Sequence, residues 1–490
     1  MNPCVLNLGG VLILASATMS QGAPRILHRT VDLEVGEVQK VSLSNGKVAQ
    51  IKLLDLREQR DEICGAVRQA EVRVEVNGQV TNVTSGTYHL PVRLGMVQID
   101  CPVTKGYLER AGDRNPWGLL KAARLRLWPA GSPWIDPGSF VYPAEQRWFA
   151  GDTQMANEPV FVDGGDLPGK QEIYYHYGLD MGGSEGLVDV VSATDGVVTV
   201  SGNDMLAGQP ADIPGERRYD VVYVRDAREW YYRYSHLKFI SPAVRPGARI
   251  SRGQKIGVIG KEGASGGWSH LHFDISARQP SGRWGIEEGY AFLWQAYEHE
   301  HPRHLVAVAR PHVLVWTGQK VLLDGSRSQG KGLRQEWMFT EGGSASGERV
   351  QHTYEMPGNY SEILKIEDAS GRVDYDFAVV QVIDRGHPEQ LPPTINANYA
   401  PTFGIRPGDP VVFKVRTFRD QASEATWDFG DGTPAVRVKS SASADPHAPD
   451  GYAEARHVYS AAGHYLVCVE PENTNGVRAV ARLQVRVGLD

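Results

Sequence analysis

Short runs of β-branched and aromatic residues, separated by turn residues, recur along the whole chain. Two examples are VDVVSATDGVVTVSG at 188–202 and RYDVVYVRDAREWYYRYSHL at 218–237. Such runs favour strands, and 54 glycines and 29 prolines supply the breaks between them. We therefore predict a mainly β chain, with short helices only near NPWGLLKAARLRL at 115–127 and GYAFLWQAYEHEH at 289–301.

The length and charge of the chain restrict its class of function. Its 490 residues suffice for three or four domains of roughly 100 to 200 residues each. The formal net charge of -7 comes without a long basic block, so we predict no nucleic-acid partner. Beyond the N-terminus, no segment approaches the roughly 20 apolar residues of a membrane-spanning helix.

The first 22 residues contain an apolar stretch that ends in small residues. This pattern is typical of a secretory signal peptide, here cleaved after Ala17 or Gly22. The alternative is a first strand of the N-terminal domain. Export predicts a location in the cell envelope (periplasmic) or outside the cell, where Cys64 and Cys101 can form a disulfide. The pairing stays open, because spacing does not show that the two sulfurs meet.

Two parts of the chain predict β domains without catalytic residues. Alternating strands at 24–148 indicate an N-terminal β-rich domain. In the C-terminal third, EWMFTEGG at 336–343 corresponds to TWDFGDGT at 426–433, and each copy continues to a Tyr-x-x-x-Gly-x-Tyr pattern. This repeat predicts two β-sandwiches, at 305–385 and 393–488, each with a tryptophan strand, and Trp427 is predicted to lie in the core of the second.

The two C-terminal copies resemble polycystic-kidney-disease (PKD) domains, whose usual WDFGDG stands intact at 427–432. The resemblance implies immunoglobulin-like modules of extracellular proteins. It also implies a role as spacers or in contacts with a polysaccharide or another protein.

The segment 149–300 contains the unusual polar residues. His176 and Asp180 stand in a His-x-x-x-Asp spacing, and WSHLHFDI places His270 and His272 on one face of a predicted strand. Zinc binds imidazole nitrogen and carboxylate oxygen, and a catalytic zinc site needs three protein ligands and a position for water. His176, Asp180 and one histidine of the pair make that count.

The remaining histidines suit proton transfer. The second histidine of the pair, taken as His270, would be within reach of a zinc-activated water without binding the metal. His236, in YRYSHL, is available to orient the water or to stabilise a developing oxyanion. The roles of His236 and His270 are exchangeable at this level.

Residues 173–276 resemble the LytM/lysostaphin-type zinc metallopeptidases. The blocks that carry the resemblance are HYGLD, YRYSHL, VRPGARISRGQKIGVIG and HLH, in the order and spacing of that family. The resemblance implies an antiparallel β peptidase domain, with zinc held by His176, Asp180 and His272 and with active-site histidines at 236 and 270. Two features depart from the family: a longer loop at 201–219, and Asp274 where a glutamate is usual.

The sequence therefore predicts a secreted zinc endopeptidase in which histidine acts as general base. The resemblance implies that its substrate is the peptide cross-links of peptidoglycan. Two alternatives remain: a catalytically silent wall-binding or adhesion scaffold, and a protease that acts on extracellular proteins.

Overall fold

The structure of the protein is a computed structural model, and it is almost entirely β. It describes residues 23–63, 65–85, 88–109, 115–148, 151, 159–161, 173–302, 305–419, 424–439, 451–471 and 477–489. The predicted signal peptide and Cys64 lie outside the described residues. Cys101 is buried, and because Cys64 is not described, their predicted pairing stays a prediction.

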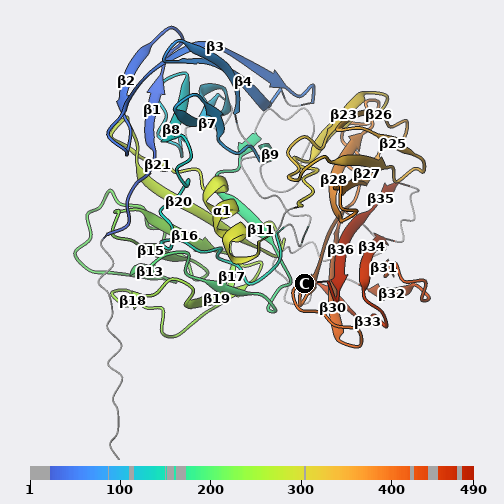
Figure 1. Ribbon diagram of the computed structural model, residues 1–490. Helices are drawn as coiled ribbons and strands as arrows, with labels where there is room; N and C mark the ends of the chain where they lie inside the picture. Colours follow the sequence, from blue (N-terminus) through green and yellow to red (C-terminus); the bar gives the residue numbers. More distant parts are fainter. Residues whose placement is uncertain are drawn as a thin grey trace, which may run out of the picture.

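The N-terminal region folds into one eight-stranded sheet, in the order β1-β8-β7-β5-β4-β3-β2 with β6 paired to β7 (Figure 1). Its elements are β1 (Arg29–Leu33), β2 (Val38–Ser42), β3 (Val48–Arg60), β4 (Val67–Val76), β5 (Gln79–Ser85), β6 (Val92–Leu94), β7 (Val97–Thr104), the 3-10 helix η1 (Lys105–Leu108) and β8 (Ala123–Pro129).

The helix predicted at 115–127 is wrong, because its second half is strand β8. In that strand Leu125 and Leu127 alternate with Arg124 and Arg126, and both faces are buried between β1 and β7. The leucines enter the core of the sheet. Each arginine is paired instead with a carboxylate, which allows a charged residue to lie inside. The alternation of leucine and arginine is thus the period of two of a strand, and the arginines are tolerated inside because each is paired.

The middle region forms two main sheets and a separate two-stranded sheet of β9 and β10. The larger runs β11-β20-β16-β15-β13-β14, with β18 on β13 and β21 on β20, and the smaller runs β12-β19-β17. Side chains from both sheets share one hydrophobic core. The elements are β9 (Pro159–Phe161), β10 (Ile173–Tyr175), β11 (Leu179–Gly182), β12 (Asp189–Val191), β13 (Gly196–Ser201), β14 (Asp204–Met205), β15 (Val222–Arg225), β16 (Tyr231–Ser235), β17 (Leu237–Ile240), β18 (Arg249–Ile250), β19 (Lys255–Ile259), β20 (His270–Arg278), β21 (Trp284–Ile286) and α1 (Tyr290–Glu300).

The helix predicted at 289–301 is confirmed as α1, the α-helix of the described residues. Its buried side chains join the core of the middle region. The N-terminal region reaches the same core through Trp128. Beside it, Arg126 pairs with Glu287 at 2.6 Å, and Glu287 also lies 3.2 Å from His28. The two regions are therefore joined by a buried ionic cluster as well as by apolar contacts.

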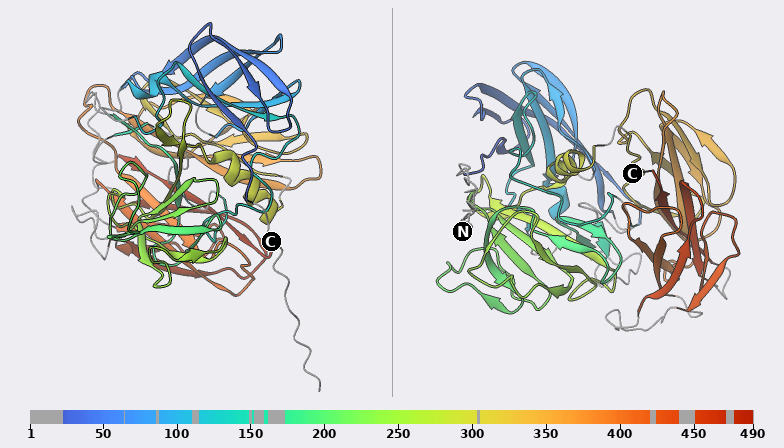
Figure 2. Two further views of the ribbon diagram at one scale, coloured as in Figure 1. Left: turned by 90° about the vertical axis from the view of Figure 1, so that its left-hand side faces the viewer. Right: turned by 60° about the horizontal axis from the view of Figure 1, so that its bottom comes forward.

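The C-terminal third forms two β-sandwiches, one above the other along the side of the other regions (Figures 1 and 2). The first pairs sheet β22-β28-β27-β24-β25 with β23-β26, and the second pairs β29-β30-β33 with β32-β31-β34-β36. Trp427 is fully buried, which confirms its predicted place in the core of the second sandwich, and Trp337 is equally buried in the first. The strands are β22 (Val313–Trp316), β23 (Lys320–Asp324), β24 (Arg334–Met338), β25 (Ser344–Ser346), β26 (Arg349–Thr353), β27 (Gly358–Glu367), β28 (Val373–Ile383), β29 (Thr394–Ala400), β30 (Pro410–Phe418), β31 (Glu424–Asp428), β32 (Val436–Lys439), β33 (Ala453–Val458), β34 (Gly463–Pro471), β35 (Arg478–Ala479) and β36 (Ala481–Val487).

Among the described residues, no helix has the length and apolar character needed to cross a bilayer.

Candidate active site

The site is built on the antiparallel pair β11 and β20. In their register Asp180 stands opposite His272, and Gly182 stands opposite His270. Leu271 and Phe273 are fully buried in the core, so the period of two turns both histidines to the opposite face of β20. The predicted division of this strand into an apolar face and a histidine face is confirmed.

Three donor atoms meet at this face. His176 Nε2 lies 2.9 Å from His272 Nδ1, and Asp180 Oδ1 lies 3.0 Å from each of these nitrogens. All three side chains are buried, and they are the set of described residues that is arranged to hold a metal ion. The three predicted ligands are thus brought together, with one carboxylate and two imidazoles.

This donor set fits zinc. Zinc bonds of about 2.0 to 2.2 Å to nitrogen and oxygen, at tetrahedral angles, separate neighbouring donors by roughly 3.3 Å. The observed separations of 2.9 and 3.0 Å are within a few tenths of that value. Three protein donors leave a fourth position for water or substrate, as in catalytic zinc sites.

Gly178 allows His176 to reach the site from the loop before β11. Its φ of +78° is left-handed, and a Cβ at this position would lie 2.7 Å from Asp274 Cβ and 2.8 Å from the carbonyl oxygen of Phe273. A larger residue would therefore clash with β20 as well as strain the backbone. The glycine in HYGLD is required by this close approach between the segments that carry His176 and His272.

Asp274 orients His272 from behind. Its Oδ2 lies 3.1 Å from His272 Nε2, which leaves Nδ1 to face the other two donors. Arg233 Nη1 lies 3.7 Å from the same carboxylate oxygen. Sequence reasoning noted Asp274 only as a departure from a family pattern. Its place two residues after His272 on the same strand face was the signal for this role.

His270 lies beside the three donors with one nitrogen already engaged. Its Nδ1 lies 2.8 Å from the carbonyl oxygen of Trp268, and its Nε2 lies 3.4 Å from Asp180 Oδ2. Because a carbonyl only accepts hydrogen bonds, Nδ1 carries the proton and Nε2 of the neutral ring is the basic atom. Burial lowers the pKa of His270, which favours this neutral form.

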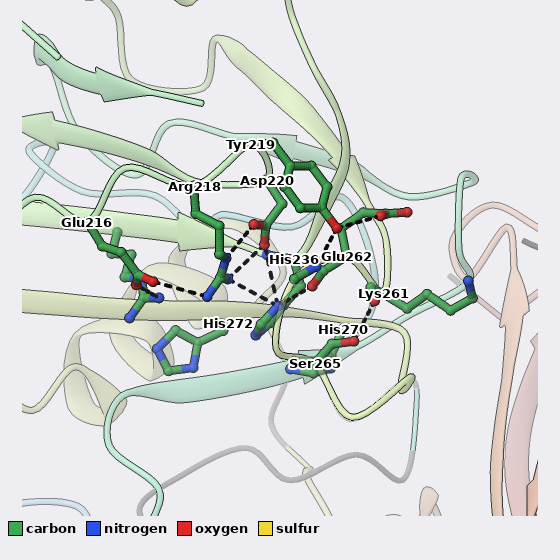
Figure 3. A network of polar contacts seen from close by, with 12 residues as sticks. Glu216, Arg218, Tyr219, Asp220, His236, Lys261, Glu262, Ser265, His270 and His272 are labelled. Carbon is green, nitrogen blue, oxygen red and sulfur yellow. Dashed lines mark hydrogen bonds and ion pairs between the residues drawn. The ribbon is translucent and has the colours of Figure 1, made fainter. Parts of the chain in front are cut away.

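His236 follows β16 and faces His270, with ring centroids 4.6 Å apart (Figure 3). Its Nδ1 lies 2.7 Å from the carbonyl oxygen of Glu262, so Nε2 is again the basic atom. Burial lowers the pKa of His236 to about 3, against the effect of Asp220. The structure thus places both remaining predicted histidines together, and each presents an unprotonated nitrogen.

Asp220 and Arg218 were missed by sequence reasoning. Asp220 Oδ2 accepts a hydrogen bond of 2.8 Å from the backbone N–H of His236, whose φ of 66° is left-handed. Arg218 forms a two-point ion pair with Asp220, and its Nη2 lies 3.5 Å from His236 Nδ1. Both residues lie at the end of the loop that the sequence marked as long, or directly after it (Figure 3). Nothing in their spacing links them to His236, so only the fold reveals the contact.

The charges around the site keep Asp180 ionised and act on His272 in the opposite sense to burial. Burial opposes ionisation of Asp180, but the surrounding histidines hold the pKa of its carboxyl well below the usual range. For His272, burial lowers the pKa. Hydrogen bonds to Asp180 and Asp274 raise it by more than burial lowers it, so the pKa lies above its usual value. A cation at this position would complete the charge balance of the buried aspartate.

Residues 174–282 match the model of Peptidase family M23, and this match contains all five predicted site residues. This segment is a Peptidase family M23 domain. Two further models, both described as PKD domain, match residues 306–382 and 395–487. The expected resemblances to a LytM-type peptidase and to two PKD domains are therefore confirmed.

Three solved structures illustrate how far the likeness extends. A protein from Ruminococcus gnavus, named for the glycyl-glycine endopeptidase LytM, is 23% identical; the match covers 33% of this chain and 61% of that one, with a TM-score of 0.21. The catalytic domain of the prophage-encoded M23 protein EnpA from Enterococcus faecalis is 21% identical, with 23% and 75% covered and a TM-score of 0.17. Csd3 from Helicobacter pylori is 13% identical, with 52% and 75% covered and a TM-score of 0.23. This chain thus spans less than two thirds of the Ruminococcus gnavus structure that it matches.

Proposed function

We propose that the protein is a secreted zinc-dependent endopeptidase that hydrolyses peptide bonds in the cross-links of peptidoglycan. One observation carries the proposal: a buried triangle of His176, Asp180 and His272 with two neutral histidines beside it. The triangle lies within the M23 domain, which associates the site with peptide hydrolysis. Secretion is proposed from the apolar N-terminal segment and from the two PKD domains.

His176, Asp180 and His272 would hold the metal. When bound, zinc supplies a Lewis acid and lowers the pKa of water to about 7. Asp180 enters the site ionised, and Asp274 keeps His272 Nδ1 directed at the metal position. The chain therefore supplies the charge and the orientation that the metal requires.

His270 acts as general base in this proposal. Its Nε2 is unprotonated because Trp268 holds the Nδ1 proton, and it faces the donor triangle. It takes the proton of the attacking water and passes it to the leaving amine. His236 Nε2 accepts the second hydrogen of the water and so orients its lone pair towards the peptide carbonyl. Both histidines present equivalent atoms, so His236 is the alternative base.

The decisive experiment follows the release of amino groups from purified peptidoglycan by the full chain. We expect about one zinc per chain, release that a chelator abolishes and zinc restores, and loss of both zinc and release in His272→Ala. His387→Ala is the matched control, because that histidine is exposed in the linker between the PKD domains.

Two other results would replace the proposal. A zinc-free chain that binds wall material and releases no amino groups is a wall-binding scaffold. Chelator-sensitive hydrolysis of an unfolded protein substrate, with peptidoglycan left intact, indicates a protease of extracellular proteins.

A further inference from the structure

The second PKD domain has one strand, β29, that is buried on both faces. Every residue of β29 is buried. Ile395, Ala397 and Tyr399 enter the core of the sandwich, whereas Asn396 and Asn398 point the other way and are still no more than 1% exposed. In a sandwich that stands alone, the outer face of such a strand is in water. The M23 domain covers this face.

The contact is polar and specific. Tyr452 Oη accepts a hydrogen bond of 2.8 Å from the backbone N–H of Ser269 and donates one of 2.5 Å to Asn396 Oδ1. Asn398 Oδ1 accepts from Ser184 Oγ at 2.9 Å. A buried polar group has lost its contacts with water, which costs several kcal/mol unless a hydrogen bond replaces them. These bonds therefore fix the relative position of the two domains.

An aromatic contact reinforces the same place. The ring of Trp268 stacks on Phe418 at the end of β30, with centroids 5.1 Å apart and planes 10° apart. Arg416, which is 1% exposed, lies over the Phe418 ring and donates to the carbonyl oxygen of Gly267 at 3.4 Å. Three successive residues of the M23 domain, 267–269, are therefore each held by the second PKD domain.

These three residues lie directly before the histidine strand. The carbonyl oxygen of Trp268 is the acceptor that fixes the ring of His270, at 2.8 Å from Nδ1. Ser269 is also bonded to Gly183, through Oγ to the carbonyl oxygen at 2.8 Å and through its own carbonyl to the N–H at 3.2 Å. Gly183 follows β11, which carries Asp180. The docked domain thus contacts the point where both catalytic strands are joined.

We propose that the second PKD domain is a fixed part of the active site, and that Tyr452 and Phe418 are positioning residues that hold segment 267–269 and, through Trp268, orient His270. The inference rests on the proposed function for its catalytic consequence. That the PKD domain orders segment 267–269 follows from the contacts and does not depend on the proposed function. A module expected from the sequence to act as a spacer or binding domain is here a support for the catalytic base.

The test uses variants of the full chain. Tyr452→Phe removes only the hydroxyl that accepts from Ser269, and Phe418→Ala removes the aromatic face, which Phe418→Tyr retains. Tyr465→Phe is the matched control: it removes a hydroxyl in the same domain that donates to the Ala461 carbonyl at 2.8 Å, on β34 in the other sheet of the sandwich. The readouts are kcat, KM, zinc content and hydrogen exchange of the 267–269 amides.

We expect Tyr452→Phe and Phe418→Ala to lower kcat roughly tenfold, with KM and zinc content unchanged, because an imprecisely held base acts in the transition state and not in binding. Exchange at Ser269 should accelerate about tenfold or more in both variants, while Phe418→Tyr and Tyr465→Phe keep wild-type values. Unchanged exchange and kcat in both interface variants would overturn the inference. A wild-type chain that releases nothing from peptidoglycan would refute the proposed function, and Ser269 exchange would still decide whether the PKD domain orders this segment.

Discussion

The carbonyl oxygen of Trp268 lies 2.8 Å from Nδ1 of His270, two residues along the chain. This contact decides the tautomer of the ring, because the carbonyl has no proton to donate. The basic nitrogen, Nε2, is consequently the one that faces Asp180 Oδ2 at 3.4 Å. A backbone atom, which no substitution of Trp268 can remove, therefore sets which atom of His270 takes a proton.

His270→Ala should keep zinc and lose activity. The side chain contributes no atom to the donor triangle, so the zinc content should stay near that of the wild type. Removal of a general base lowers rates by about 10² to 10⁴. Metal analysis and initial rates on peptidoglycan measure the two effects. Loss of zinc together with activity would assign His270 to the metal instead.

Removal of a ligand should cancel the stabilisation that zinc gives. Zinc at about 100 to 1,000 times its Kd stabilises a chain that binds it only when folded by roughly 2.7 to 4.1 kcal/mol. We expect this increment in the chelator-treated wild type after zinc is returned, and no increment in Asp180→Ala. Urea unfolding with and without zinc measures it, with His387→Ala as the control that retains the increment.

Asp274→Ala should weaken zinc binding without abolishing it. The carboxylate lies 3.1 Å from His272 Nε2 and keeps Nδ1 directed at the other donors. Loss of such an orienting partner typically costs about 10-fold to 100-fold in metal affinity. Competition with a chromogenic chelator gives the affinity. Asp274→Asn retains an acceptor oxygen and should recover part of it; an affinity equal to the wild type in Asp274→Ala would show that His272 is oriented by the strand alone.

The candidate metal donors could be predicted because they stand in two short motifs, His-x-x-x-Asp at 176–180 and His-x-His at 270–272. His270, His272 and Asp274 share one strand face by the period of two, and Gly178 marks the close approach that brings His176 to β20. The helix predicted at 115–127 was wrong because an Arg-Leu alternation suits a strand only if the arginines find buried carboxylates. Those carboxylates, Asp32 and Asp100, lie on other strands.

The remaining parts of the site depend on contacts between distant segments. Asp220 lies 16 residues before His236, and its carboxylate contacts a backbone N–H, which leaves no pattern of residue types to find. The docking of Tyr452 on Ser269 joins residues 183 positions apart in two different domains. Neither Tyr452 nor Ser269 is unusual in its local sequence, so only the fold shows that they meet.

Asp220→Ala should lower both activity and stability. Asp220 satisfies the backbone N–H of His236 in its left-handed conformation and neutralises Arg218. An unsatisfied buried amide costs about 1 to 3 kcal/mol, and a displaced His236 ring should reduce kcat roughly tenfold. Denaturant unfolding and steady-state kinetics measure these effects. Asp384→Ala is the control, since that carboxylate accepts from the N–H of Gly386 in an exposed turn; equal losses in both variants would refute a role for Asp220 in positioning His236.

The junction between the N-terminal sheet and the M23 domain should weaken in acid through Glu287. Burial opposes ionisation of this carboxyl, but His28 and Arg126 lower its pKa from 4.5 to about 2. The folded chain therefore holds the proton less tightly than the unfolded chain. The stabilisation is complete above about pH 4.5 and is lost as the pH falls towards 2.

A shift of this size corresponds to about 3 kcal/mol across that window. The free energy of unfolding of the wild type, measured in urea between pH 7 and pH 3, should fall more steeply than that of Glu287→Gln, which cannot titrate at this position. Glu287→Gln should itself be destabilised near neutral pH, because Arg126 then loses one of its two buried carboxylate partners. Glu348→Gln, at an exposed glutamate, should keep the wild-type slope. Parallel pH profiles for the wild type and Glu287→Gln would place the acid sensitivity elsewhere in the chain.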